Sequence, residues 1–182
     1  CIAIKSGKDN DGRRWNLPSK DILIRNCIMR DGHAGVAIGS EISGSVYNVT
    51  VQDCYMDSPN LDRVLRIKSN PARGGEVANI RVKNIEVGEC KLAIVGLELK
   101  YWYTDKGPYM PSFHDIYVEN VRSKKSRYMI HVDGLEGKEL AKDIYLKDCN
   151  INGVTESEIN HLVGVGKIEF DNVYVNGVKQ TK

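Results

Sequence analysis

The sequence predicts an all-β protein, a parallel β-helix of about six coils, and two observations support this fold class. A nine-residue pattern recurs six times, beginning at residues 21, 48, 79, 115, 143 and 167, which is a spacing of 24 to 36 residues. Between the repeats lie further short, strand-like runs, and no stretch has the pattern of an amphipathic helix longer than two or three turns. Strands that recur at this period without helices indicate the stacked coils of a β-helix, because βαβ units would need helices between their strands.

The repeats also predict which side chains face the interior. Their second and fourth positions are always aliphatic or Phe, and side chains two residues apart in a strand share one face. The two interior columns are Ile22, Val49, Ile80, Ile116, Ile144 and Ile168, and then Ile24, Val51, Val82, Val118, Leu146 and Phe170. The sixth position is always Asn or Asp, residues that bond neighbouring backbone and tolerate unusual dihedral angles. The corners of the coils are therefore predicted at Asn26, Asp53, Asn84, Asn120, Asp148 and Asn172.

A second set of strands alternates with the repeats. In order they read "CIAIKSG", "GVAIGSE", "RVLRIKSN", "AIVGLELKY", "YMIHVDG" and "HLVGVGK". The polar segment "GKDNDGRR" after the first of them predicts a loop in which Asp9 and Asp11 are solvated. In "RVLRIKSN" the aliphatic residues can be buried while Arg66 and Lys68 stand on the other face, about 7 Å apart. From the residues alone, this basic pair is either a solvated edge or a site for an anion.

Composition excludes several classes of function. The net charge of +2, without a basic block interleaved with aromatic residues, argues against nucleic acid as a partner. No run is long and apolar enough to cross a membrane. Five cysteines exclude a complete disulfide framework. None of them lies in a C-x-x-C pair, so we expect no structural zinc. We also expect no other cofactor. Cys27 and Cys54 are expected to stack as small buried residues rather than to form a disulfide.

Three of the strand motifs together resemble the second half of glycoside hydrolase family 28, the polygalacturonase family. They are "CIAIKSG", "GHAGVAIGSE" and "RVLRIKSN". The family pattern places N-T-D, D-D, G-H-G and R-I-K on successive coils, and this sequence has "GHA" at 32–34 and "RIK" at 66–68, with Ala34 in place of the second glycine. The resemblance implies a right-handed β-helix and the inverting hydrolysis of α-1,4-galacturonosyl bonds in pectin.

The resemblance also implies that the sequence is part of a longer hydrolase. In the family the paired aspartates directly precede a run like "CIAIKSG", and this sequence begins at Cys1. We therefore expect residues 1–182 to be a single β-helix domain, truncated at its N-terminal end. Glycoside hydrolysis needs one carboxylic acid to protonate the leaving oxygen and one carboxylate to activate water. Since these aspartates are expected outside the chain, the fragment alone is expected to be inactive.

The remaining motif residues are expected to hold the substrate. Each galacturonate carries a carboxylate, which Arg66 can bind through its planar fork and Lys68 through its mobile charge. His33 matches the family histidine that lies beside the acidic cluster and supports catalysis by setting its protonation. Tyr103 fits the substrate-contacting tyrosine of the family, and Tyr101 is an alternative.

Smaller features complete the expected site. The small residues Gly35, Ala37 and Gly39 would leave an open floor where a sugar ring can approach the backbone. A basic rim is expected from Lys5, Arg13, Arg14, Arg63 and Arg73.

Two other functions fit the same architecture. One is a non-catalytic β-helix module that binds polyuronate or mediates adhesion. The other, a pectate lyase, would need a calcium-binding carboxylate cluster where these strands offer Arg and Lys. Within the hydrolase reading, "GSE" and "SPNLDRVLRIK" resemble exo-acting bacterial members. We expect a pectin oligosaccharide as partner, self-association through the uncapped first coil, and a secreted or periplasmic location because pectin lies outside cells.

Overall fold

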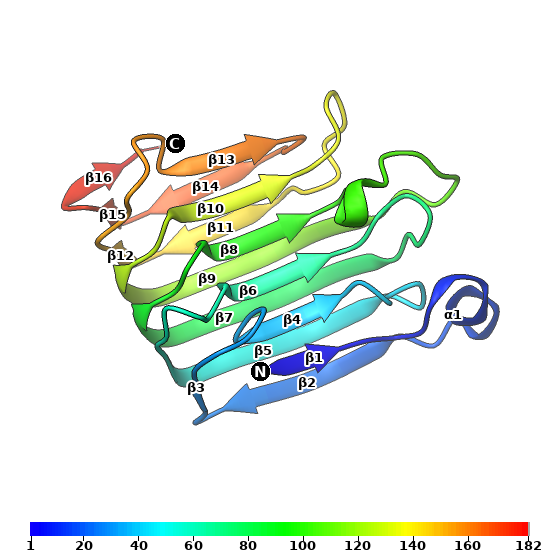
Figure 1. Ribbon diagram of the computed structural model, residues 1–182, viewed down its shortest axis with the longest axis horizontal. Coiled ribbons are helices and arrows are strands. Elements are labelled where there is room, and N and C mark those ends of the chain that lie inside the picture. Colours follow the sequence, from blue (N-terminus) through cyan, green and yellow to red (C-terminus); the bar gives the residue numbers. More distant parts are fainter. Residues whose placement is uncertain (182) are drawn as a thin grey trace.

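A computed structural model describes residues 1–181, apart from the side chain of Tyr103. The chain winds as a right-handed parallel β-helix of six coils, which confirms the predicted fold class (Figure 1). Each coil contributes one strand to a six-stranded sheet and one or more strands to a ten-stranded sheet. The strands of the two sheets run in opposite directions, and the loops that follow the six-stranded sheet gather at one end of the coils.

The strand order follows the coils. The six-stranded sheet consists of β1 (Ile2–Ile4), β4 (Val36–Gly39), β6 (Arg63–Lys68), β8 (Ala93–Glu98), β10 (Tyr128–Asp133) and β13 (Asn160–Val163). The ten-stranded sheet consists of β2 (Ser19–Arg25), β3 (Ile28–Met29), β5 (Val46–Met56), β7 (Glu76–Glu89), β9 (Ser112–Lys125), β11 (Ile144–Lys147), β12 (Asn150–Ile151), β14 (Ile168–Asp171), β15 (Val173–Val175) and β16 (Val178–Gln180). The last pair, β15 with β16, is antiparallel.

The interior columns are those that the repeats predict. The second positions pair coil by coil from Ile22 to Ile168, and the fourth positions pair from Ile24 to Phe170. The inner four members of each column are at most 2% exposed, whereas the end members Ile22, Ile168 and Phe170 are partly exposed and Ile24 is 7% exposed, because each packs against one neighbouring coil only. The stacked columns therefore form one continuous apolar core.

Asn and Asp turn the corners of the coils in the left-handed conformation. All six predicted corner residues have φ between 49° and 55°. Their side chains bond from coil to coil: Asn84 donates to Asp53 at 2.8 Å, and Asn120 donates to Asn84 at 2.9 Å. A second ladder occupies the first position of the repeat, where Asn48 donates to Asp21 at 2.8 Å. This second ladder was not predicted, although five of the six repeats begin with Asn or Asp.

The cysteines are small packing residues. All five are free thiols, so the expectation that Cys27 and Cys54 form no disulfide is confirmed. Cys54 is buried, but Cys27 is only half-buried because it lies on the first coil. Burial raises the pKa of Cys90 to about 12 and that of Cys149 to about 11, which keeps both thiols protonated and unreactive.

The polar segment after β1 is a helix rather than the predicted loop. Helix α1 (Asp9–Trp15) ends at Asn16, which adopts a left-handed conformation and closes the last turn. Gly12 packs against Gly7 so closely that a side chain at Gly12 would overlap the Gly7 backbone. The close contact explains how a segment rich in Asp and Gly is held helical against the coil. In the described part of the chain, no helix is long and apolar enough to cross a membrane.

Candidate functional site

The outer face of the six-stranded sheet carries the predicted basic pair in two adjacent columns. Because its strands pair in register, Arg66 lies between Ala37 on the preceding coil and Gly96 on the next, followed by His131 and His161. The neighbouring column contains, in coil order, Gly39, Lys68, Glu98 and Asp133. Outward side chains from four coils therefore meet on one surface.

Arg66 is held by carboxylates rather than projecting into solvent as the sequence suggested. Its Nε and Nη2 atoms donate to the two carboxylate oxygens of Glu98, each at 3.1 Å, and its Nη1 lies 3.6 Å from Asp62. Arg63 contacts the same two acids and lies 2.7 Å from Glu98. The side chains of Arg63 and Arg66 are 7% and 11% exposed. Two carboxylates thus neutralise two guanidinium groups and fix the plane of the Arg66 fork.

Arg63 reaches this cluster across Gly96. A Cβ at Gly96 would overlap the Cδ and Nε atoms of Arg63, so the missing side chain gives the guanidinium its path. Burial lowers the pKa of Arg63, and Glu98 opposes this effect. The guanidinium remains charged, because arginine does not lose its proton in folded proteins.

Lys68 is the cation that the cluster leaves unmatched. Among the described residues it forms no salt bridge, and its Nζ lies 3.5 Å from the hydroxyl of Tyr101 and 4.5 Å from the centre of that ring. Burial and the neighbouring Arg66 lower the pKa of Lys68, while Tyr101 raises it. A partly buried ammonium that forms no salt bridge among the described residues gains stability when an anion arrives.

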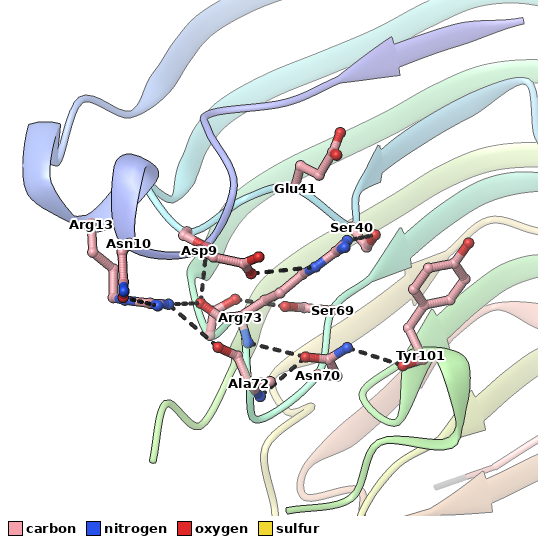
Figure 2. Close-up of polar contacts among 12 residues, drawn as sticks. Asp9, Asn10, Arg13, Ser40, Glu41, Ser69, Asn70, Ala72, Arg73 and Tyr101 are labelled. Carbon is pink, nitrogen blue, oxygen red and sulfur yellow. Dashed lines mark hydrogen bonds and ion pairs between the residues drawn. The ribbon is translucent and has the colours of Figure 1, made fainter. Parts of the chain in front are cut away.

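A hydrogen-bonded loop after β6 fixes the position of Tyr101, the first residue of the short 3₁₀ helix η1 (Tyr101–Tyr103). Asn70 belongs to this loop and connects it to Tyr101 (Figure 2). Its Oδ1 accepts from the backbone N–H of Arg73 at 3.0 Å, and its Nδ2 donates to the carbonyl of Tyr101 at 3.0 Å. The Tyr101 N–H in turn donates to the carbonyl of Ser69 at 3.0 Å. The backbone that carries the phenol is therefore tied on both sides.

Arg73 anchors the same loop from beneath. Its side chain is 8% exposed, contacts Ser40 and lies 3.6 Å from Asp9 of α1 (Figure 2). Its carbonyl accepts hydrogen bonds from Arg13 at 2.8 Å and from Ser43 at 3.0 Å. These contacts join loops from three coils into one unit.

Two of the five cations expected in the basic rim are buried, and the other three remain at least partly exposed. Arg63 and Arg73 are buried, which corrects the expectation that they border the site in solvent. Lys5 binds Glu41 at 2.8 Å, and this hydrogen bond and charge lower the pKa of Glu41. Arg14 lies 3.8 Å from an acidic residue of its own helix. Arg63 and Arg73 therefore serve structural contacts, whereas Lys5 and Arg14 remain at the surface.

His33 lies one turn away from Arg66, on the other side of Asp62. Gly32 pairs with Leu61, and the Asp62 N–H donates to the Gly32 carbonyl at 2.8 Å, so His33 stands opposite Asp62. His33 is exposed and borders a cavity of about 340 Å³ that Asp62 also lines. Asp62 likewise lines a second cavity, of about 370 Å³, which contains Arg66. The imidazole and the basic pair thus share one flank of the β-helix.

The remaining expected site residues are Tyr103 and the three small residues of the expected open floor. The side chain of Tyr103 lies outside the described residues, and its role stays a prediction. Of the three small residues expected to form an open floor, only Ala37 is partly exposed. Gly35 is buried against Met56, so closely that a side chain at this position would overlap it. Gly39 is buried against the next coil.

Sequence reasoning missed the two acids that organise the basic pair. The signal for Glu98 was present, because aligning "RVLRIKS" with "AIVGLEL" sets Glu98 beside Lys68 on the outward face. Asp62 directly precedes a strand and gave no periodic signal. The roles of Asn70 and Arg73 depend on loop conformation, which strand alternation does not encode.

The cluster is suited to holding an anion rather than to transferring protons. The Glu98 carboxylate is engaged by two guanidinium groups, whereas Lys68 has no acidic partner within ion-pair distance among the described residues. Among residues 1–181 as described, no three His, Cys, Asp or Glu side chains are grouped so as to hold a metal ion.

Comparisons with known sequences identify the family and two similar proteins. The model of the family described as "Glycosyl hydrolases family 28" matches residues 1–167. A probable polygalacturonase of Vitis vinifera is 34% identical over 94 residues, which cover 51% of this chain and 19% of that protein. A polygalacturonase of Ralstonia nicotianae is 40% identical over 104 residues, which cover 56% of this chain and 19% of that protein. The chain therefore spans about a fifth of the length of these curated relatives.

A solved structure extends the similarity to almost the whole chain. The hyperthermoactive exopolygalacturonase of Thermotoga maritima aligns with a TM-score of 0.87 and 33% sequence identity, covering 97% of this chain and 38% of that one. The family model covers far more than half of the sequence. The chain belongs to glycosyl hydrolase family 28.

Proposed function

We propose that the chain is the C-terminal, substrate-holding part of a longer exo-acting polygalacturonase. The whole enzyme would hydrolyse α-1,4-galacturonosyl bonds of pectin with inversion, and this chain alone would bind without cleaving. The similarity to an exopolygalacturonase, of which the chain covers 38%, supports both the mode of action and the greater length of the enzyme.

The observation that carries the proposal is the unmatched ammonium of Lys68. A galacturonate carboxylate would supply the counter-ion that the described residues do not, and the Tyr101 hydroxyl could bind the same group. Arg66 lies on the same strand, and its guanidinium plane is already fixed by Glu98. A pre-oriented donor loses less conformational freedom when it binds its ligand.

His33 would support the acid and base groups from the side. The amino group of Cys1 donates to the carbonyl of Ala34, and the Cys1 thiol lies 3.1 Å from the carbonyl of Asp31. Carboxylates immediately before Cys1 would therefore come next to His33. An imidazole at that distance can shift the pKa of a carboxyl group and so help to divide the acid and base roles.

The decisive experiment replaces Lys68 in the full-length protein. We expect Lys68→Met to lower kcat/KM on polygalacturonate by about 10- to 100-fold, as for a lost charge-assisted hydrogen bond. Lys147→Met, on the outer face of the opposite sheet, is the matched control and should leave the rate unchanged. Product analysis should show release of single end sugars.

Three outcomes would redirect the proposal. An unchanged kcat/KM in Lys68→Met would remove the anion-site assignment. Products of many lengths would indicate endo action. Binding of polygalacturonate without new reducing ends would favour the non-catalytic polyuronate-binding module instead. Because the polymer is extracellular, we also propose that the full-length protein is secreted or periplasmic.

A further inference from the structure

The cavity that contains Arg66 extends over the following two coils. Besides Arg66 and Glu98, its walls include Lys100, Trp102, His131 and Asp133. Its volume of about 370 Å³ lies within the range of sites that enclose small organic molecules. The described surface thus continues from the proposed carboxylate site toward the C-terminal coils.

The charged walls of this cavity cancel. Its cations are Arg63, Arg66 and Lys100, and its carboxylates are Asp62, Glu98 and Asp133. They are already matched, with Lys100 Nζ 2.8 Å from Asp133 and the two guanidinium groups bound to the other acids. A ligand in this part of the cavity would therefore be held by hydrogen bonds rather than by net charge.

His131 is one of three aromatic residues with a hydrogen-bonding group in the cavity wall, together with Tyr101 and Trp102. Its ring stacks on His161 with centroids 4.7 Å apart and meets Tyr128 at 5.4 Å. Burial, His161 and Arg63 lower the pKa of His131, so the imidazole is uncharged near neutral pH. An uncharged ring carries one N–H donor, and the surroundings determine on which nitrogen it lies.

Two unpaired buried nitrogens define the tautomer. Nδ1 of His131 and Nε of Arg63 are both buried without a hydrogen-bond partner in the described structure. Both side chains adjoin Gly96, His131 as its strand neighbour and Arg63 by passing over it. The Arg63 charge acts on His131, and guanidinium nitrogens can only donate, so we infer that the buried Nδ1 is the unprotonated ring nitrogen. The proton would then reside on Nε2, since only Nδ1 of this ring is buried without a partner and His131 lines the cavity.

We propose that His131 donates a hydrogen bond from Nε2 to an oxygen of a further sugar unit, next along the chain from the unit that Lys68 binds. The inference rests on the proposed function and adds a third sugar position, beyond the two sugars that flank the cleaved bond, one of which Lys68 binds. Its ligand is a uronate or its uncharged ester, recognised through hydroxyl or ring oxygens. The position lies outside the motif residues that identify the family.

The test compares substrates of two and three sugars in the full-length enzyme. We expect His131→Phe, which keeps an aromatic ring but removes the donor, to lower kcat/KM for trigalacturonate about three- to tenfold while leaving digalacturonate unchanged. His131→Gln can present an amide N–H near the position of Nε2 and should restore most of the loss. His114→Gln, on the ten-stranded sheet, should affect neither substrate.

The dependence on chain length separates binding from general damage to the fold. Equal losses on both substrates, or no loss on either, would overturn the inference while the hydrolase proposal stands. Failure of His131→Gln to exceed His131→Phe on the trimer would also overturn it. A wild-type enzyme that cleaves neither substrate would remove the proposed function and this inference together.

Discussion

Replacing Glu98 with Ala should destabilise the protein far more than removing an acid from a surface ion pair. Glu98 is 13% exposed and binds Arg63 at 2.7 Å and Arg66 at 2.9 Å, and both guanidinium groups are about nine-tenths buried. After the substitution, Asp62 alone faces two buried positive charges. Removing one partner from a buried pair costs about 3–5 kcal/mol. Since Asp62 offsets part of the charge, we expect about 3 kcal/mol.

The matched control is Glu41→Ala. Glu41 binds Lys5 at 2.8 Å, but these side chains are 36% and 46% exposed, so solvent screens the pair and its loss should cost about 0–1 kcal/mol. Urea denaturation followed by circular dichroism would give both free energies of unfolding. The measurement should be repeated in 1 M NaCl, where the Debye length is about 3 Å.

Salt should reduce the small cost of Glu41→Ala and leave that of Glu98→Ala nearly unchanged, because buried charges are screened much less. Equal costs for the two variants, both below about 1 kcal/mol, would contradict the inference that the cluster is desolvated. The same would follow from a Glu98→Ala cost that disappears in high salt.

Three further predictions concern the fold. His114 is held by Glu76 and Asp115, whose hydrogen bonds outweigh the opposing effect of burial and raise its pKa. The resulting stability should be present below about pH 6.5 and disappear as pH rises through the folded pKa, so denaturation midpoints should fall between about pH 6 and 8, and His114→Gln should flatten the profile. Asn84→Ala should cost about 2 kcal/mol in urea unfolding, since it breaks ladder bonds and puts Ala at φ 54°, whereas Asn84→Gly should cost less. The 182-residue chain should self-associate through its exposed first coil, where Ile28 is 72% exposed, and monomers in concentrated sedimentation runs would contradict this.

The fold could be read from the sequence because one repeat fixes both period and register. Aliphatic residues at the second and fourth positions face inward in every coil, and the Asn or Asp at the sixth position turns the corner. A shift of one residue would expose every column at once, so the pairing is strongly specified. Helix α1 could not be predicted in this way, because it lies in the connection between two strands, where the repeat imposes no pattern.

The site was predictable only in part. Alternation in a strand indicated that Arg66 and Lys68 share an outward face, and this placement is what the register shows. Alternation says nothing of the next coil, which supplies Glu98 and so changes Arg66 from an exposed cation into a bound one. The burial of Arg73 likewise depends on contacts from distant loops. Contacts between coils therefore decide which cation remains available to bind a ligand, and the pattern of a single strand does not predict them.

The two cations of "RIK" have different roles: Arg66 is bound by carboxylates of the protein, and Lys68 is left for a ligand. A guanidinium has several donors in one plane, so Arg66 can bind Glu98 through Nε and Nη2 while its Nη1 faces Asp62 at 3.6 Å. The ammonium of Lys68 is a single charged centre, and a carboxylate partner in the protein would occupy it. Leaving Lys68 beside a neutral phenol keeps it open for a ligand, while its partial burial makes the unliganded state less favourable. The coil spacing enforces this division, because the strand that brings Glu98 to Arg66 is also the one that leads directly into Tyr101.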